Sequence, residues 1–205
     1  MSMYNIGIHP GRVWNSSSSQ LSYELGRVWE LPAEAAKDMP LLNLTSGLGG
    51  YPGYAGRWLV RRVKNASGGV LTCGDFVVSK NLTAGGVGRW HATTTTTAAV
   101  TRAFGLGVVL GGQGQNDEVS STGTKAVPTT IADGDDFLVC VAGLVFVKTT
   151  SALTTDGEAL VTTATAGALG AMSAGSEHCV IGYVADPNTR DASNRQLAFI
   201  DCLAY

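Results

Sequence analysis

Side chains that could act as nucleophiles, bases or metal ligands stand far apart in this sequence. His9, His91 and His178 have no second ligand at the spacing of a metal site. The serine within 170–175 lies one position too late for a nucleophile elbow. A serine–histidine–aspartate triad assembles only in the fold, so it stays open, but nothing in the sequence favours it. We therefore predict that the protein is not an enzyme and has no catalytic residue.

Glycine, aspartate and cysteine patterns give equally little sign of a cofactor or a metal. The glycines at 105 and 107 lie in a strand-like run with no helix after it, unlike a dinucleotide fingerprint. Residues 133–136 resemble part of a calcium loop, but no acidic residue follows at the twelfth position, so a turn is favoured. No two cysteines form a CxxC pair. We predict no cofactor, no metal, and four reduced thiols with Cys140 and Cys179 buried.

Recognition of a protein partner is the chemistry that the sequence favours. Arg57, Arg61, Arg62 and Lys64 place four cations in eight residues. They indicate either a salt-sensitive contact to an acidic surface or an ordinary solvated strand face. Aromatic side chains recur through residues 1–55, where they could anchor a partner or pack back onto the rest of the chain. The candidate contact residues are Trp14, Tyr23, Trp29, Tyr51, Tyr54, Arg57, Arg61 and Arg62.

The first 55 residues are predicted to form an irregular, extended N-terminal arm. Residues 20–30 could form a short helix with Leu21, Leu25, Val28 and Trp29 on one face, and a second could run from 32 to 38. Such an arm has little core of its own. We therefore expect it to become ordered on a partner.

Residues 56–205 are predicted to form one small antiparallel β-barrel or sandwich. The β-branched runs and turn dipeptides, among them Asp133-Gly134 and Asp156-Gly157, carry this prediction. Gly143 interrupts the longest apolar run and predicts a bent strand or two consecutive strands. Between 100 and 110, small residues on one face would allow another backbone to approach closely. The expected strands cover 57–64, 70–79, 100–110, 136–149, 158–163, 179–185 and 195–203.

Composition argues against two classes of partner. The formal charge is −2 and charged residues make up 15% of the chain, so direct nucleic-acid binding is not expected. The longest apolar run, 137–147, is far shorter than the roughly 20 residues of a membrane helix. Residues 1–14 do not have the pattern of a secretory signal, so we expect synthesis in a cytoplasm.

Residues 136–186 resemble a β-rich module of the head-decoration, or capsid cement, proteins of tailed bacteriophages. The stretch DFLVCVAGLVFVKTTSALTTDGEALVTTATAGAL is followed by VIGYVAD. A Val-rich strand, a T-x-G-x-x-L turn and a returning V-I-G-x-V strand carry the resemblance. It covers about a quarter of the chain, and residues 1–55 lie outside it.

The resemblance implies a structural protein bound to the outer capsid surface of a virion made in a host cytoplasm. Its partner would be the major capsid protein, and the protein would be a homo-oligomer, with a trimer favoured. No catalytic residue is implied. The alternatives are another virion structural protein, such as a minor capsid or tail-surface protein, and a small cytosolic β-barrel ligand-binding protein or enzyme.

Overall fold

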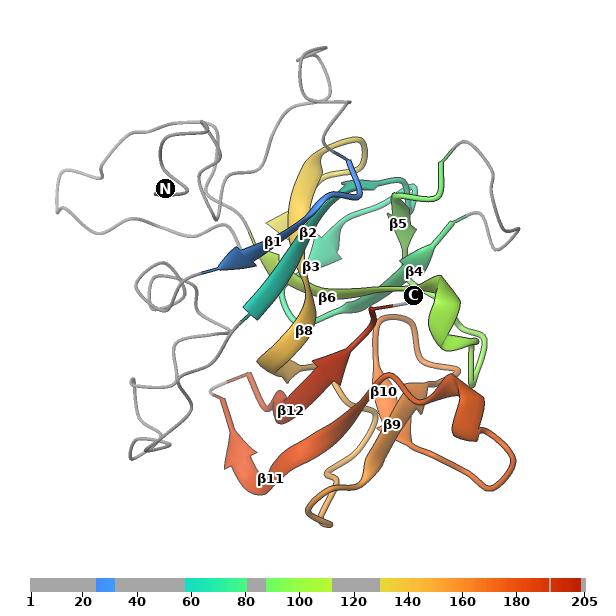
Figure 1. The fold of residues 1–205 in the computed structure, drawn as a ribbon, viewed down its shortest axis with the longest axis vertical. Helices are drawn as coiled ribbons and strands as arrows, with labels where there is room; N and C mark the ends of the chain where they lie inside the picture. Colours follow the sequence, from blue (N-terminus) through green and yellow to red (C-terminus); the bar gives the residue numbers. More distant parts are fainter. Residues whose placement is uncertain (1–24, 32–57, 81–87, 112–129, 192, 204–205) are drawn as a thin grey trace, which may run out of the picture.

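The computed structural model describes residues 25–31, 58–80, 88–111, 130–191 and 193–203, and these residues form an all-β fold (Figure 1). Short 3-10 turns, η3 at Arg102–Phe104 and η4 at Glu177–Cys179, are the helical elements of this part of the chain. The strands are β1 Val28–Leu31, β2 Trp58–Asn65, β3 Leu71–Thr72, β4 Phe76–Ser79, β5 His91–Thr93, β6 Gly105–Gly111, β7 Thr130–Ile131, β8 Asp136–Val147, β9 Ala159–Thr162, β10 Leu169–Ala171, β11 Gly182–Arg190 and β12 Gln196–Asp201.

Five strands close into a ring. The order is β2, β5, β4, β6 and β8, and β8 pairs back onto β2. The pairing of β2 with β5 is parallel, and the other four pairings are antiparallel. β1 adds to the same edge of β2 as β5, along the first half of that strand. The ring confirms the predicted barrel, although one of its pairings is not antiparallel.

The end of β8 joins the ring to the other half of the fold, which contains β9 to β12. Residues 142–147 of β8 pair with β12, and β11, β9 and β10 continue the sheet. A parallel bridge between Thr149 and Leu169 brings β10 back beside the end of β8. In Figure 1 the two halves lie one above the other, with β8 running from the upper half into the lower.

β8 is buried on both faces because it lies between two hydrophobic clusters. Phe137, Val139 and Val141 belong to one, whereas Leu138 and Cys140 belong to the other. Both faces of this strand are therefore apolar, which explains its uninterrupted hydrophobic sequence. Gly143, with a φ of +131°, lies next to the residue where β8 leaves β2 for β12. The bent-strand alternative for this glycine is thus the one that the structure favours.

Gly107 lets β6 and β8 approach closely. A Cβ atom there would lie 2.3 Å from the carbonyl oxygen of Cys140, and the φ of +133° is one that side chains avoid. The predicted close approach of another backbone is confirmed at this position. The strand also shifts its register here, so Leu106 and Val108 enter different clusters.

Near the start of the chain, one prediction of secondary structure is wrong. Residues 28–30 are extended in β1, not helical, because Val28 pairs with Arg61 of β2 and packs against the smaller cluster. The described part of the expected arm is thus part of the sheet. The helix expected at 32–38 lies outside the described residues.

Candidate functional site

The two neighbouring arginines of β2 have different environments. Successive residues of a strand point to opposite faces, so Arg61 and Arg62 project into different surroundings. Arg61 retains 8% of its exposed surface and Arg62 retains 0%. Arg61 and Arg62 belong to one basic cluster in the sequence, but they lie on different faces of β2 in the fold.

Arg62 forms a buried ion pair. Its Nη2 donates to Oδ2 of Asp136 at 2.7 Å, and both side chains are almost entirely covered. Burial raises the pKa of Asp136, and the Arg62 cation opposes that shift. Neither a partner contact nor a solvated strand face describes Arg62, because its side chain does not reach the surface. We therefore correct the expectation for this residue.

Arg61 stacks on Trp90. Its guanidinium carbon lies 4.6 Å from the centroid of the Trp90 ring, and that of Arg89 lies 5.0 Å from the same centroid. Both distances are typical of cation–π contacts. Across the sheet, Val28 and Val139 stand directly opposite Arg61 and flank its aliphatic part. We call Arg61, Arg89 and Trp90 the Trp90 cluster.

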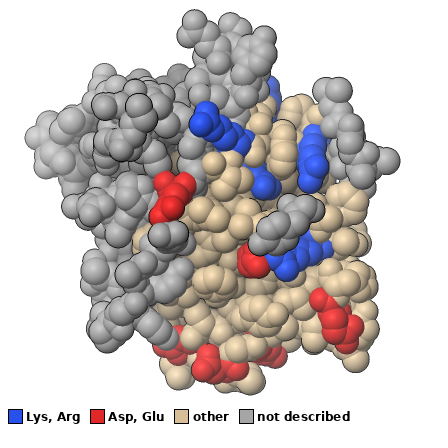
Figure 2. Space-filling model, in the orientation of Figure 1, with Lys and Arg blue, Asp and Glu red and all other residues tan. Residues whose placement is uncertain are grey.

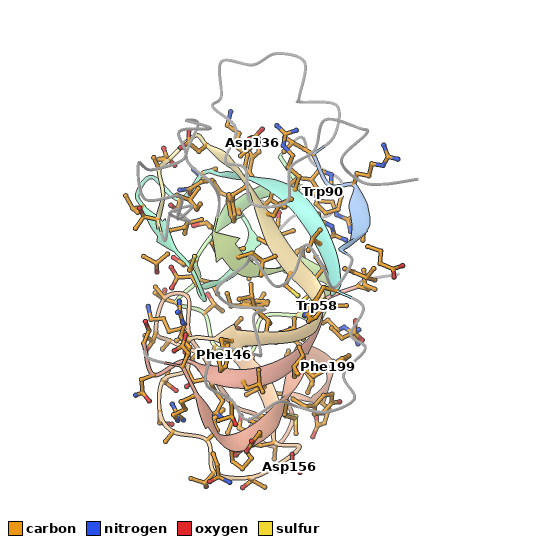
Figure 3. The ribbon with its side chains drawn as sticks, turned by 90° about the vertical axis from the view of Figure 1, so that its left-hand side faces the viewer. Trp58, Trp90, Asp136, Phe146, Asp156 and Phe199 are labelled. Atoms are coloured by element: carbon orange, nitrogen blue, oxygen red, sulfur yellow. The ribbon has the colours of Figure 1, made fainter. Side chains whose placement is uncertain are left out.

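Backbone contacts position the Trp90 ring. The amide of Lys64 donates to the carbonyl of Trp90, and the amide of Gly26 donates to that of Arg62. A Cβ atom on Gly26 would lie 2.1 Å from the ring, so only glycine lets the chain enter β1 at this place. Figure 3 shows Trp90 beside β1 and β2. The ring is therefore held where β1 and β5 share one edge of β2.

The Arg61 guanidinium of the Trp90 cluster is a cation largely removed from water. Burial lowers the pKa of Arg61, and the charge of Arg89 contributes to the same shift. The guanidinium stays protonated in spite of this, because its ordinary pKa is so high. Its Nε atom is buried and has no hydrogen-bond partner. The cluster thus holds two positive charges beside one aromatic ring.

Most of the other predicted contact residues lie outside the described part of the chain. These are Trp14, Tyr23, Tyr51, Tyr54 and Arg57. Trp29 pairs with Val60 through the backbone of β1. Sequence reasoning missed Arg89 and Trp90, although an Arg-Trp dipeptide two residues before a β-prone threonine run was a usable signal.

The histidines of the described residues lie in different elements of the fold. His91 lies in β5 and His178 in η4, and His9 is outside the described residues. Within the described ranges, no three His, Cys, Asp or Glu side chains form a group that could hold a metal ion. The thiols of Cys73, Cys140, Cys179 and Cys202 are free and buried, which confirms the expectation for Cys140 and Cys179.

A surface depression of about 400 Å³ lies between the β3–β4 turn, the end of β8 and the β11–β12 loop. Its walls include Cys73, whose pKa burial raises to about 11. Arg195 on the same wall donates to the Cys73 carbonyl and pairs with Asp191. A neutral thiol and an engaged arginine do not make a nucleophilic site.

The lower half carries an exposed aromatic pair. Tyr183 of β11 and Phe199 of β12 stand directly opposite each other and are 48% and 41% exposed. Phe199 is seen on the lower half in Figure 3. It faces Leu144 of β8 across the next pairing. Together with the Trp90 cluster, this pair is a surface feature that a partner could cover.

Comparison with known proteins adds no name to these features. No protein-family model matches the chain, and no curated protein matches it significantly. Among the described residues, no helix has the length and apolar character needed to cross a lipid bilayer.

Proposed function

We propose that the protein is a structural component of a tailed-phage particle that binds the outer surface of the capsid and stabilises it. The resemblance of residues 136–186 to head-decoration proteins carries this proposal. In the fold those residues span β8 to most of β11, which belong to one sheet with turns at Gly157 and Gly167. In the sheet order β12 lies between β8 and β11, so the resembling residues and β12 together form this part of the sheet.

The partner would be the major capsid protein, and the protein would act as a homo-oligomer, with a trimer favoured. Its action would be thermodynamic. A contact that spans several capsid subunits exists only in the assembled shell, so binding favours that shell by mass action. Several copies joined in one oligomer would multiply weak individual contacts. A role without catalysis is compatible with the scattered histidines and buried thiols described above.

Two surface features could supply the contacts. The Trp90 cluster offers positive charge beside an aromatic ring, and the Tyr183–Phe199 pair offers an apolar patch. Aromatic and arginine side chains are enriched where protein interfaces derive most of their binding energy. These features lie in different halves of the fold, so one could face the capsid while the other meets a second copy.

The test is addition of the purified protein to particles that lack it. Expanded heads from a phage deleted for this gene are mixed with the protein and sedimented, and the bound fraction is imaged. We expect stoichiometric co-sedimentation, regular density on the outer surface and a higher temperature of head disruption. Protein that stays in the supernatant and leaves head stability unchanged would contradict the proposal. Density confined to the tail would instead favour a tail-surface protein.

A further inference from the structure

We propose that the Trp90 cluster is a binding site for a carboxylate group on an acidic segment of a partner protein. This inference deepens the proposed function, since it names the chemistry of the partner surface. It rests on the geometry of Arg61, Arg89 and Trp90, and carboxylate binding can be tested without a phage particle.

Arg61 is a buried cation that lacks a counter-ion among the described residues. It retains 8% exposure, and its Nε donor is buried without a hydrogen-bond acceptor. The Trp90 ring 4.6 Å away gives only part of the stabilisation that water or a carboxylate would give. A buried donor without an acceptor is costly, so the Arg61 guanidinium gains from an anion that approaches its outer edge.

Arg89 adds a second positive charge to the same ring. The two guanidiniums lie 4.6 and 5.0 Å from one centroid, so they repel each other. An acidic group that meets both removes that repulsion and gains two charge-assisted contacts. The planar guanidinium fork also matches the two oxygens of a carboxylate. Both effects select an anion with a carboxylate's shape.

The site is pre-organised by the backbone around it. Gly26 lies against the ring, and Lys64 holds the Trp90 carbonyl. Val28 and Val139 are the cross-strand neighbours of Arg61 on its two sides. Binding therefore requires little reordering of the protein side, which favours affinity.

Charge favours an acidic protein segment over a nucleic acid. The whole chain has a formal charge of −2, and a long polyanion would meet that excess negative charge. On the face shown in Figure 2, Lys and Arg gather mainly in the upper part, whereas Asp and Glu lie mostly toward the lower edge. A short acidic segment could contact the cationic part alone. The apolar ring would also accommodate a neighbouring apolar side chain of such a segment.

The experiment titrates ¹⁵N-labelled protein with a tetraglutamate peptide whose ends are blocked, and follows the indole N–H of Trp90. The Trp90→Phe variant assigns that signal, and a blocked tetraglutamine peptide is the uncharged control. We expect a saturable shift with tetraglutamate and none with tetraglutamine. Arg61→Met and Arg89→Met should each weaken binding about tenfold or more, since each removes a charge-assisted contact.

Lys80→Met provides the matched control. Lys80 is exposed and lies next to β5, where its amide donates to the carbonyl of His91. The Lys80→Met variant also removes one positive charge, but from outside the Trp90 cluster, so we expect the affinity for tetraglutamate to change less than about twofold. Arg89 is exposed, so Arg89→Met tests the site even if Arg61→Met fails to fold.

Three results would overturn the inference: no shift with tetraglutamate, unchanged affinity in Arg89→Met, or tighter binding of oligothymidylate at the same indole. Head sedimentation separates the two proposals. If Arg89→Met loses the peptide but decorates heads normally, the site is not the particle contact and the proposed function stands. If wild-type protein binds the peptide but no head, the proposed function fails and the carboxylate site stands.

Discussion

Replacing one member of the Arg62–Asp136 pair should destabilise the fold far more than replacing both. Arg62→Met removes the cation that donates to the buried Asp136 carboxylate, and Asp136→Val removes the carboxylate that accepts from the Arg62 guanidinium. The residues are 0% and 7% exposed, so water cannot replace the lost partner. Removing one member of a buried pair costs about 3–5 kcal/mol, whereas an apolar replacement of both is often close to neutral.

The magnitude is large for a chain of this size. A loss of about 3–5 kcal/mol lowers the melting temperature by on the order of 10 °C. The double variant should recover most of that loss, because no uncompensated charge remains in the interior. Lys64 stands directly opposite Asp136 in the β2–β8 ladder, and its charge favours the ionised carboxylate, so it lessens the cost of Arg62→Met.

Urea unfolding of the wild type, both single variants and the double variant, followed by tryptophan fluorescence, gives the double-mutant cycle. Arg61→Met serves as the neighbouring control on the same strand, with a smaller expected loss of stability because no buried anion is left behind. The reasoning is refuted if either single variant costs less than about 1 kcal/mol, or if the two losses simply add.

Three further predictions concern the core, the thiols and the beginning of the chain. Gly107→Ala should lower the free energy of unfolding, measured in urea, by more than about 4 kcal/mol. Gly134→Ala, at positive φ with open space around it, should lower it by about 1–2 kcal/mol. Equal losses would contradict the backbone clash at Gly107. Burial raises the pKa of Cys73 to about 11 and of Cys202 to about 12. Ellman's reagent at pH 8 should therefore label only a trace of the folded protein, but all four thiols after denaturation. Rapid labelling of the native protein, or a native disulfide in non-reducing mass spectrometry, would contradict this. Deleting residues 1–24, which spares β1, should leave the circular-dichroism spectrum β-rich but weaken attachment to heads; unchanged attachment would show that this segment makes no contact.

The β-rich character of the fold could be predicted because short stretches of sequence determine it. β-branched runs and Asp-Gly turns indicated β2, β8, β9 and β12 close to their observed bounds. The short strand β5 was not predicted, since three residues carry no periodicity. Its pairing with β2 is parallel and joins segments that are remote in sequence. Such pairings depend on tertiary packing, which local propensity does not contain.

β1 shows how tertiary context overrides a helical pattern. Leu25, Val28 and Trp29 have helical spacing, yet the open edge of β2 offers backbone partners for an extended chain. The same limit applies to the candidate site. Four cations in eight residues were visible in the sequence, but the alternation of β2 separates Arg61 from Arg62. The approach of Arg89 and Trp90 to Arg61 joins residues 28 and 29 positions apart.

Because the first half of β8 pairs within the ring of strands and its second half pairs with β12, neither half of the fold is complete without this strand. Cutting the chain at Gly143 would strip one wall from each half, and the Trp58 indole, which donates to the Leu144 carbonyl from β2, would lose its acceptor. A force applied to either half would therefore be transmitted through a continuous strand rather than through a hinge. We therefore expect the two halves to unfold together in a single thermal transition.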